Sequence, residues 1–288
     1  MKVKLLLEKV YWALAKRTRV KKQKSYEGWL AKGYNNTPDI SFIIQSHNKS
    51  NSVIHTVKQL RKYPKAEIIV MDDGSTPDHT KRLVNFLDGA NEFLIRANDL
   101  YENVMYDKAI RFANGTYLVL LQDDDEIVGL DWVDKAIAYF RQYPDMAILG
   151  GFNGLDFTIY EEEKWGVADL YKNKDISEKE FLFVHAVNRA PMFIHKPLYM
   201  QHLKHIRFSF APFQCDDTEL CLRAWLSGLK VGWYNAGFRS LMAGGMRIWN
   251  NEFTRTQEQR NKRQLYDLYK DHIIQLNGLV EEANKSLS

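Results

Sequence analysis

The sequence contains few residues of the kinds that build disulfide frameworks or membrane spans. Only two cysteines occur among 288 residues, Cys215 and Cys221, so a disulfide scaffold and a CxxC metal motif are both excluded. No apolar run approaches the roughly 18 residues that a membrane-spanning helix needs, and no internal repeat is present. With 45% hydrophobic and 13% aromatic residues, the chain is expected to be globular, in a reducing compartment, with both cysteines as packing residues.

Positive charge is concentrated at the start of the chain. The formal net charge is +4, but residues 1–24 hold nine lysines and arginines against one acid, Glu8. That segment carries +8, and residues 25–288 carry −4. It is no convincing signal peptide, because Glu8 breaks its apolar run and no small-residue cleavage site follows. On a helix, one face would hold Val3, Leu6, Leu7, Val10 and Leu14.

Such a helix has two interpretations. A basic helix with exposed apolar and aromatic groups suits an anionic membrane surface, and we expect residues 1–24 to bind one. The alternative is a helix packed on its own domain, with a solvated basic face. Nucleic acid is not expected as a partner.

Strand and helix patterns alternate over the next part of the chain. This alternation predicts an α/β fold with a mainly parallel central sheet. The expected strands are 40–44, 67–71, 93–96, 116–121 and 146–150, and the expected helices are 52–63, 80–87, 106–113 and 131–143.

Beyond residue 151 the pattern loosens. Residues 153–180 are expected to form loops that shape a substrate site, and helices return at 217–227 and 254–287. We therefore divide the chain into a basic amphipathic extension, one catalytic domain and a C-terminal helical extension, with bounds at 1–37, 38–250 and 251–288.

Paired acids follow the second expected strand. Asp72 and Asp73 come directly after an apolar run, and ligands of open α/β sheets bind beyond the carboxyl ends of strands. An aspartate there can accept a hydrogen bond from a nucleobase N–H or a ribose hydroxyl. The alternative is a plain turn, because Asp-Gly-Ser is favourable turn chemistry.

A second acidic cluster follows the strand 116–121. Asp123, Asp124, Asp125 and Glu126 are consecutive, and their charges repel one another unless a cation compensates them. In extended backbone Asp123 and Asp125 project to the same side. Two hard oxygen ligands, with phosphate oxygens completing the shell, suit Mg²⁺ or Mn²⁺. The alternative is a solvated acidic loop.

A third acidic pair opens the helix expected at 217–227. Asp216 or Asp217 can cap that helix, since acids favour helix N-termini. The functional alternative is a general base near the same cleft.

In this order and spacing, the three clusters resemble the inverting family-two glycosyltransferases of GT-A fold. That fold is a Rossmann-like three-layer α/β domain, and the resemblance covers residues 38–250. The matching segments are 41–48 for the opening strand and nucleotide turn, 67–75 for the second strand, 113–125 for the metal motif, and 216–223 for the acidic pair and its helix.

The resemblance implies a role for each matching residue. Asp72 contacts the nucleobase, and Gln45, Ser46 and Asn48 line the nucleotide pocket. Asp123 and Asp124 face the nucleotide sugar, Asp125 binds the cation with Asp123, Asp217 is the catalytic base, and Asp216 lies on the acceptor side.

The chain departs from the family pattern at two informative places. Tyr106-Asp107 stands where many members have Arg-Asn, and Met242 stands about where many have a metal-ligating histidine. The third metal ligand is therefore left open. Arg247 is a candidate to neutralise the diphosphate, because arginine pairs well with phosphate oxygens.

The implied enzyme is a metal-dependent inverting glycosyltransferase. It moves a sugar from a nucleotide-sugar donor to a glycan or lipid-linked acceptor in surface-polysaccharide synthesis, with Mn²⁺ or Mg²⁺ as cofactor. We expect it in the cytoplasm, peripheral on the inner face of the cell membrane. Two alternatives remain: a haloacid-dehalogenase-type phosphatase with Asp123 as nucleophile, and a catalytically silent sugar-nucleotide or glycan-binding module.

Other residues have simpler interpretations. Trp165 and Tyr171 are candidates to stack on an acceptor sugar. Metal binding by His195, His202 or His205 lacks supporting carboxylates. The aromatics expected in the core are Trp132, Phe140, Trp225 and Trp233.

Overall fold

The sheet predicted from the sequence forms the centre of the molecule. The structure is a computed structural model, in which the described residues are 2–33, 37–87, 89–98, 100, 102–127, 129–161, 164–169, 178–189, 191–212, 214–237, 239–240 and 252–287. Eight strands form one sheet in the order β3-β2-β1-β4-β11-β6-β12-β9. Their bounds are β1 Ile40–Ser46, β2 Ala66–Asp73, β3 Glu92–Ala97, β4 Tyr117–Leu121, β6 Met146–Gly150, β9 Phe181–Phe183, β11 Met192–His195 and β12 Lys230–Tyr234.

Most of this sheet is parallel, as predicted. Strands β1, β2, β3 and β4 pair in parallel, and so do β6 and β12. Only β11 and β9 run against their neighbours. Strand β1 has apolar side chains on both faces of the sheet, and Phe42, Ile43 and Ile44 are fully buried, which is why its sequence is a continuous apolar run.

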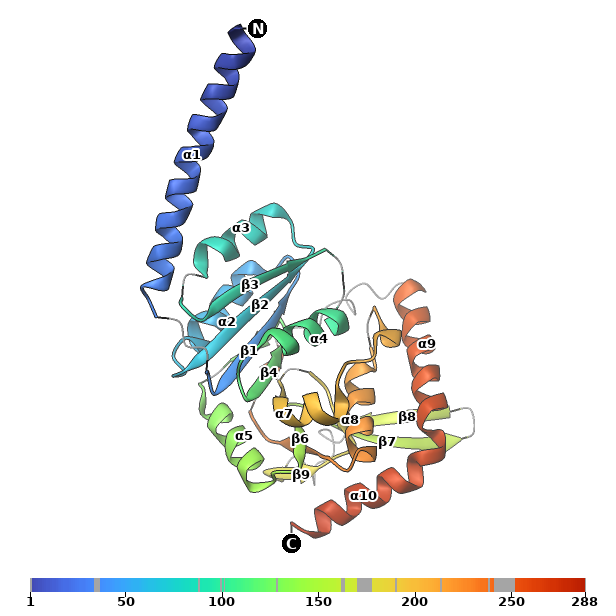
Figure 1. Cartoon of the computed structure of the whole chain (residues 1–288). Coiled ribbons are helices and arrows are strands. Elements are labelled where there is room, and N and C mark those ends of the chain that lie inside the picture. The colour runs from blue at the N-terminus through green and yellow to red at the C-terminus, as the bar shows by residue number, and fades with distance from the viewer. Residues whose placement is uncertain are drawn as a thin grey trace.

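Helices cover both faces of the sheet and make the three expected layers. Helix α4 lies in front of the strands in Figure 1, and right-handed crossovers put α2 and α3 on the opposite face. Helices α5 and α8 pack on β6. The bounds are α2 Ser50–Leu60, α3 Pro77–Phe86, α4 Glu102–Phe112, α5 Asp131–Gln142 and α8 Asp216–Leu226.

The prediction of loops over 153–180 is wrong for its first part. Strands β7 (Gly154–Glu161) and β8 (Lys164–Asp169) form an antiparallel hairpin, and β10 (Ala186–Val187) pairs with β7. The alternation of Leu155, Phe157 and Ile159 with polar residues is the period-two signal of such a strand. Phe157 is buried and its ring meets that of Tyr269 edge-on.

The C-terminal helices are α9 (Glu252–Tyr269) and α10 (Ile273–Lys285), joined by the 3₁₀ turn Lys270–His272. They pack on α8 and on the strands β7 and β9. The Tyr269 hydroxyl donates to Glu219 Oε1 at 2.9 Å, and the Asn284 side chain bonds both the N–H and the carbonyl of Phe183. The segment 252–287 is therefore bonded directly to α8 and to the sheet, through Tyr269 and Asn284.

Helix α1 (Lys2–Leu30) stands away from the rest of the molecule, as Figure 1 shows. Its large apolar side chains are exposed, with Leu6 at 63% and Trp12 at 68%. Its last turn is fixed to the body: Trp29 Nε1 donates to the Gly89 carbonyl at 3.0 Å, and its ring meets Phe93 edge-on. A helix packed along its own domain is thus not what the structure contains. None of the described helices is both long and apolar enough to cross a bilayer.

We predict that Gly115→Ala destabilises the fold. A methyl group at Gly115 would lie 2.6 Å from the Ser41 backbone nitrogen, and backbone atoms of a central strand cannot move aside cheaply. The expected loss is about 1–3 kcal/mol in the free energy of unfolding, measured by urea denaturation. Gly278→Ala is the control, because its added methyl meets nothing within 4 Å in α10 and should be neutral or stabilising. Equal effects of the two substitutions would contradict the prediction.

Candidate active site

The loop after β1 joins the ends of β2 and β4. Asn48 adopts a left-handed conformation, with φ of 58°, and bonds the turn after β2: its N–H donates to Ser75 Oγ at 2.8 Å, and its Oδ1 accepts from Thr76 N at 2.9 Å. On the other side, His47 N donates to Asp123 Oδ2 at 2.9 Å. Because β1 lies between β2 and β4 in the sheet, this loop brings the first two acidic clusters to one edge.

Asp72 is a buried acceptor at that edge. Its carboxylate is fully buried, and Thr80 Oγ1 donates to Oδ2 at 2.6 Å. Its Oδ1 has no hydrogen-bond partner among the described residues, nor has Ser46 Oγ on the residue paired with it across β1 and β2. Gln45, one residue earlier, is partly buried. Unpaired buried oxygens cost free energy, so these atoms are suited to a ligand that donates hydrogen bonds.

The Asp123–Asp125 turn buries two further unpaired oxygens. Asp125 Oδ2 accepts from Gln122 N at 2.7 Å, whereas Asp125 Oδ1 and Asp124 Oδ2 have no partner in the described part of the chain. Burial raises the pKa of both Asp124 and Asp125, and the neighbouring carboxylates add to the rise. The electrostatic cost of ionising them is therefore high without a positive charge nearby.

These two oxygens fit a divalent cation. Carboxylate oxygens are the hard donors that Mg²⁺ and Mn²⁺ prefer, and the two have no competing bond. No group of three or more possible metal-binding side chains occurs among the described residues, so the rest of a coordination shell would come from elsewhere. Strand β13 (Arg239–Ser240) pairs with β5 (Asp125–Glu126), which brings the chain just before Met242 to this turn. Met242 itself lies outside the described residues.

Lys49 supplies a positive charge to the same turn. Its ammonium lies 2.9 Å from Asp123 Oδ1. Burial alone would lower the pKa of Lys49, but the hydrogen bond and the charges of Asp123, Asp124 and Asp125 outweigh burial and leave the pKa raised. Lys49 is thus held as a cation beside three carboxylates.

The two acids of the third pair, Asp216 and Asp217, have different hydrogen-bond partners. Both oxygens of Asp216 accept from Arg189, at 2.7 and 2.8 Å, and this ion pair is almost fully buried. Asp217 instead accepts hydrogen bonds from two backbone N–H groups, those of Thr218, at 2.8 Å, and of Arg189. Burial raises the pKa of Asp217, Arg189 opposes the rise, and Asp216 adds to it. A raised pKa makes the Asp217 carboxylate a better proton acceptor than an ordinary aspartate.

Tyr106 connects this pair to the end of β4. Its hydroxyl donates to the Leu121 carbonyl at 2.7 Å, and the Arg189 guanidinium lies over its ring at 5.0 Å. Through Tyr106 and Arg189, the N-terminus of α8 is fixed beside the strand that ends at the acidic turn. All three clusters therefore meet at one end of the sheet.

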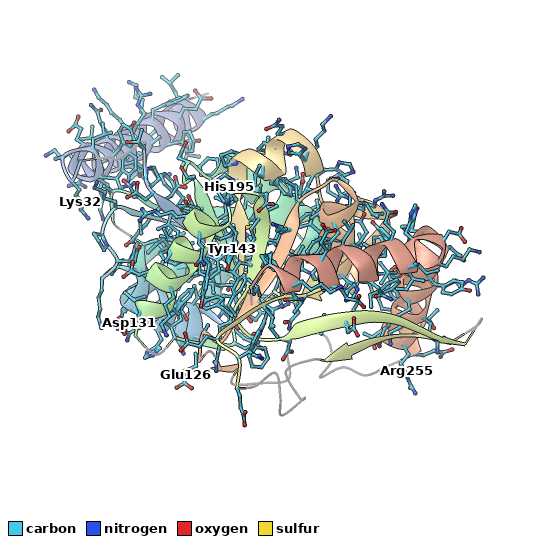
Figure 2. The ribbon with its side chains drawn as sticks, turned by 90° about the horizontal axis from the view of Figure 1, so that it is seen from below. Lys32, Glu126, Asp131, Tyr143, His195 and Arg255 are labelled. Carbon is cyan, nitrogen blue, oxygen red and sulfur yellow. The ribbon has the colours of Figure 1, made fainter. Side chains whose placement is uncertain are left out.

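Several predicted residues lie elsewhere or outside the described residues. Arg247 and Tyr171 are not among the described residues, and only the backbone of Trp165, on β8, is described. His195 pairs with Tyr117 at the start of β4, opposite the acidic end, and its ring packs near Tyr117 and Phe140. Figure 2 shows His195 well away from Glu126, which adjoins the acidic turn. Burial lowers its pKa, so His195 is a packing residue.

The remaining expectations for single residues concern the core. Neither cysteine forms a disulfide, and burial raises the pKa of the Cys215 thiol to about 12, which makes it unreactive. The four expected core aromatics are each at most 4% exposed: Trp132, Phe140, Trp225 and Trp233.

Sequence reasoning missed the roles of Lys49, Tyr106 and Arg189. Tyr106 carried a signal, because it departs from the family pattern and is large and aromatic. Lys49 is one residue past the nucleotide turn, and Arg189 lies in a segment whose apolar residues show neither a helical nor a strand periodicity. Their partners are 74 and 27 residues away along the chain, so the sequence alone does not identify them.

With this geometry in place, comparison with known proteins defines the class. The family model described as glycosyl transferase family 2 matches residues 41–206, more than half of the chain. The protein therefore belongs to glycosyl transferase family 2. A curated relative, "Uncharacterized protein y4gI" of Sinorhizobium fredii, is 23% identical in an alignment of 222 residues that covers 68% of this chain and 24% of the relative. The chain thus spans about a quarter of that relative's length.

Solved structures show the GT-A fold. A mannosyltransferase of Pyrobaculum calidifontis with GDP-Man and Mn²⁺ has a TM-score of 0.59 at 13% identity, over 92% of this chain and 77% of its own. GalNAc-T7 with UDP, GalNAc and Mn²⁺ has a TM-score of 0.61 at 15% identity, over 83% of this chain and 50% of its own. TarS of S. aureus with UDP-GlcNAc has a TM-score of 0.54 at 14% identity, over 74% of this chain and 61% of its own. The expectation of a GT-A fold is confirmed.

We predict that Arg189→Met unfolds the protein more easily. The substitution leaves the buried Asp216 carboxylate unpaired, which costs about 3–5 kcal/mol in the free energy of unfolding, measured by urea denaturation. The double variant Arg189→Met/Asp216→Asn should recover part of this loss. Arg263→Met is the control, because the Arg263–Asp267 pair is mostly exposed and such pairs contribute about 0–1 kcal/mol. A loss at Arg189 as small as at Arg263 would contradict the prediction.

Proposed function

We propose that this protein transfers a sugar from a nucleotide-sugar donor to a glycan or lipid-linked acceptor, with inversion at the anomeric carbon and with Mn²⁺ or Mg²⁺. The observation that carries the proposal is the gathering of buried, unpaired carboxylate oxygens of Asp72, Asp124 and Asp125 at one end of the sheet. A nucleobase donates to such oxygens and a divalent cation coordinates them. Relatives of the same fold contain GDP-Man with Mn²⁺, or UDP with GalNAc and Mn²⁺.

Each residue contributes a specific part of donor binding. Asp72 Oδ1 accepts from an N–H of the base, and Ser46, paired with Asp72 across β1 and β2, and Gln45 are proposed to contact the same nucleotide. Asn48 keeps the loop in the conformation that joins both clusters. Asp124 and Asp125 would hold the cation, and Asp123 remains beside the donor sugar. When bound, the cation neutralises charge on the departing diphosphate, and Arg247 is proposed to assist it.

Asp217 is proposed as the general base. Its raised pKa makes it a better proton acceptor than an ordinary aspartate, and Arg189 and Asp216 hold its backbone in place. The acceptor hydroxyl gives its proton to Asp217 as its oxygen attacks the anomeric carbon, and the bond to the diphosphate breaks on the opposite face. A single displacement of this kind inverts the centre. Asp216 lies on the acceptor side and acts through its bond to Arg189, and Trp165 on β8 is proposed to stack on the acceptor sugar.

We predict that Asp217→Asn abolishes transfer and keeps donor binding. Thermal-shift titration of UDP-, GDP- and dTDP-sugars with Mn²⁺ first identifies the donor, and release of the nucleoside diphosphate then measures turnover. The asparagine cannot take the proton, so the rate should fall by at least about a hundredfold with a donor affinity close to that of the wild type.

The pH profile follows from the same pKa. Because a base acts only when deprotonated and burial raises the pKa of Asp217, turnover should rise with pH through a midpoint above about 4, the ordinary aspartate value. Substantial turnover by Asp217→Asn would remove Asp217 from the role. Absence of any nucleotide-sugar binding would instead contradict the proposed reaction.

We further propose that α1 binds an anionic membrane surface. The helix has two unlike halves: residues 3–14 carry most of its apolar side chains, and residues 16–24 carry six lysines and arginines. Both are exposed, and the apolar half lies at the end far from the body. Apolar side chains enter the interface while basic ones meet anionic headgroups. This placement supports a peripheral enzyme of the inner membrane face, where lipid-linked acceptors of surface polysaccharide synthesis are made.

We predict that reversing three charges of α1 weakens vesicle binding. In the full chain, the variant is Lys21→Glu, Lys22→Glu and Lys24→Glu, and the control reverses the exposed Lys62, Lys81 and Lys108. Each basic residue near an anionic surface contributes about 1 kcal/mol, so co-sedimentation with phosphatidylserine vesicles should weaken by about a hundredfold in the first variant and little in the control. Equal binding to neutral vesicles, or equal loss in both variants, would overturn the membrane proposal.

A further inference from the structure

Asp123 differs from its two neighbours in the acidic turn. Both of its carboxylate oxygens are occupied, Oδ1 by the Lys49 ammonium and Oδ2 by His47 N, each at 2.9 Å. Its backbone carbonyl accepts from Ser52 Oγ at 2.6 Å. Every one of these donors comes from the loop after β1 or the first turn of α2. Asp124 and Asp125 make no side-chain bond to that loop and keep one unpaired oxygen each.

We infer that Lys49 and Asp123 form a resident neutral pair, outside the coordination shell of the cation, that ties the nucleotide turn to the metal turn before the donor binds. The inference rests on the proposed function and revises one part of the sequence prediction, in which Asp123 shares the metal with Asp125.

The charge balance supports this division of roles. Three carboxylates carry three negative charges, and Lys49 neutralises one of them at Asp123. The two that remain, on Asp124 and Asp125, equal the charge of one divalent cation. If Asp123 coordinated the cation, the cation would have to displace the Lys49 ammonium or lie beside it. The cation and the ammonium would then repel each other strongly in this partly buried site. The pair is only 28% and 14% exposed at its two side chains.

The pair also accounts for the shape of the site. Lys49 directly precedes α2, and Asn48 before it is bonded to the turn after β2. One short segment therefore holds the base-binding and metal-binding turns together through Asn48 and Lys49. A neutral pair does this with no net charge added to the place where the diphosphate enters.

The test measures Mn²⁺ affinity, which does not depend on turnover. Free Mn²⁺ is followed by electron paramagnetic resonance as the metal alone is titrated into the full chain. Lys49→Met makes the turn more negative and should tighten Mn²⁺ binding at least about fivefold, and Asp123→Asn should weaken it at least about fivefold, because Lys49 then lacks its counter-charge. The double variant Lys49→Met/Asp123→Asn restores the charge balance and should bind within about twofold of the wild type.

Two further variants fix the interpretation. Asp125→Asn should lose at least about tenfold in Mn²⁺ affinity, because it removes a ligand. Lys230→Met, which breaks a similar pair to Asp145 at 2.9 Å far along the chain, should leave Mn²⁺ affinity unchanged. A double variant that binds at least tenfold more weakly than the wild type would show that Asp123 is a ligand and overturn the inference alone. Failure of the wild type to bind Mn²⁺ would overturn the proposed cation site as well.

Discussion

The site depends on one electrostatic constraint: carboxylates are buried at the ends of buried strands and at the start of α8. Ionised carboxylates in such a place require a compensating positive charge or several hydrogen bonds. The chain compensates some of them internally, Asp216 with Arg189 and Asp123 with Lys49. It leaves others, chiefly Asp124 and Asp125, uncompensated among the described residues. The carboxylates that lack an internal partner are those a donor and its cation would stabilise.

The strands and the acidic ends were predictable because both signals are local. A continuous apolar run predicts a buried strand, and acids that follow it directly must lie at its carboxyl end. Asp72 and Asp125 could be placed at one edge of a parallel sheet for that reason alone. The β7–β8 hairpin was missed although its first strand alternates, because charged residues within it obscured the period. Helical structure over 254–287 was predicted, but its division into α9 and α10 was not. The bonds of these helices to Glu219 and Phe183 join parts of the chain that no local pattern relates.

The residues that pair with some of these carboxylates, and so leave the others unpaired, could not be predicted from the sequence. Tyr106, Arg189 and Lys49 act at long sequence separation, and each pairing depends on how helices lie across the sheet. At the position of Tyr106, where many members of the family have an arginine, this chain has a neutral aromatic ring under an arginine from another segment. The positive charge at this point therefore comes from Arg189 in the loop before β11, and its hydrogen bonds go to Asp216 rather than toward the diphosphate.

The separation of charges also concerns helix α1, which stands apart from the rest of the molecule. Its +8 segment would be attracted to the uncompensated acids of the site, and a basic helix lying there would compete with the cation. The anchor at Trp29 on β3 and the loop before it sends the helix outward instead. Its basic residues then remain available to an external anionic surface, and the acidic turn remains available to a cation. The net charge of +4 is therefore the sum of a basic helix and an acidic body. The helix is suited to an anionic surface, and the acidic turn is suited to a cation.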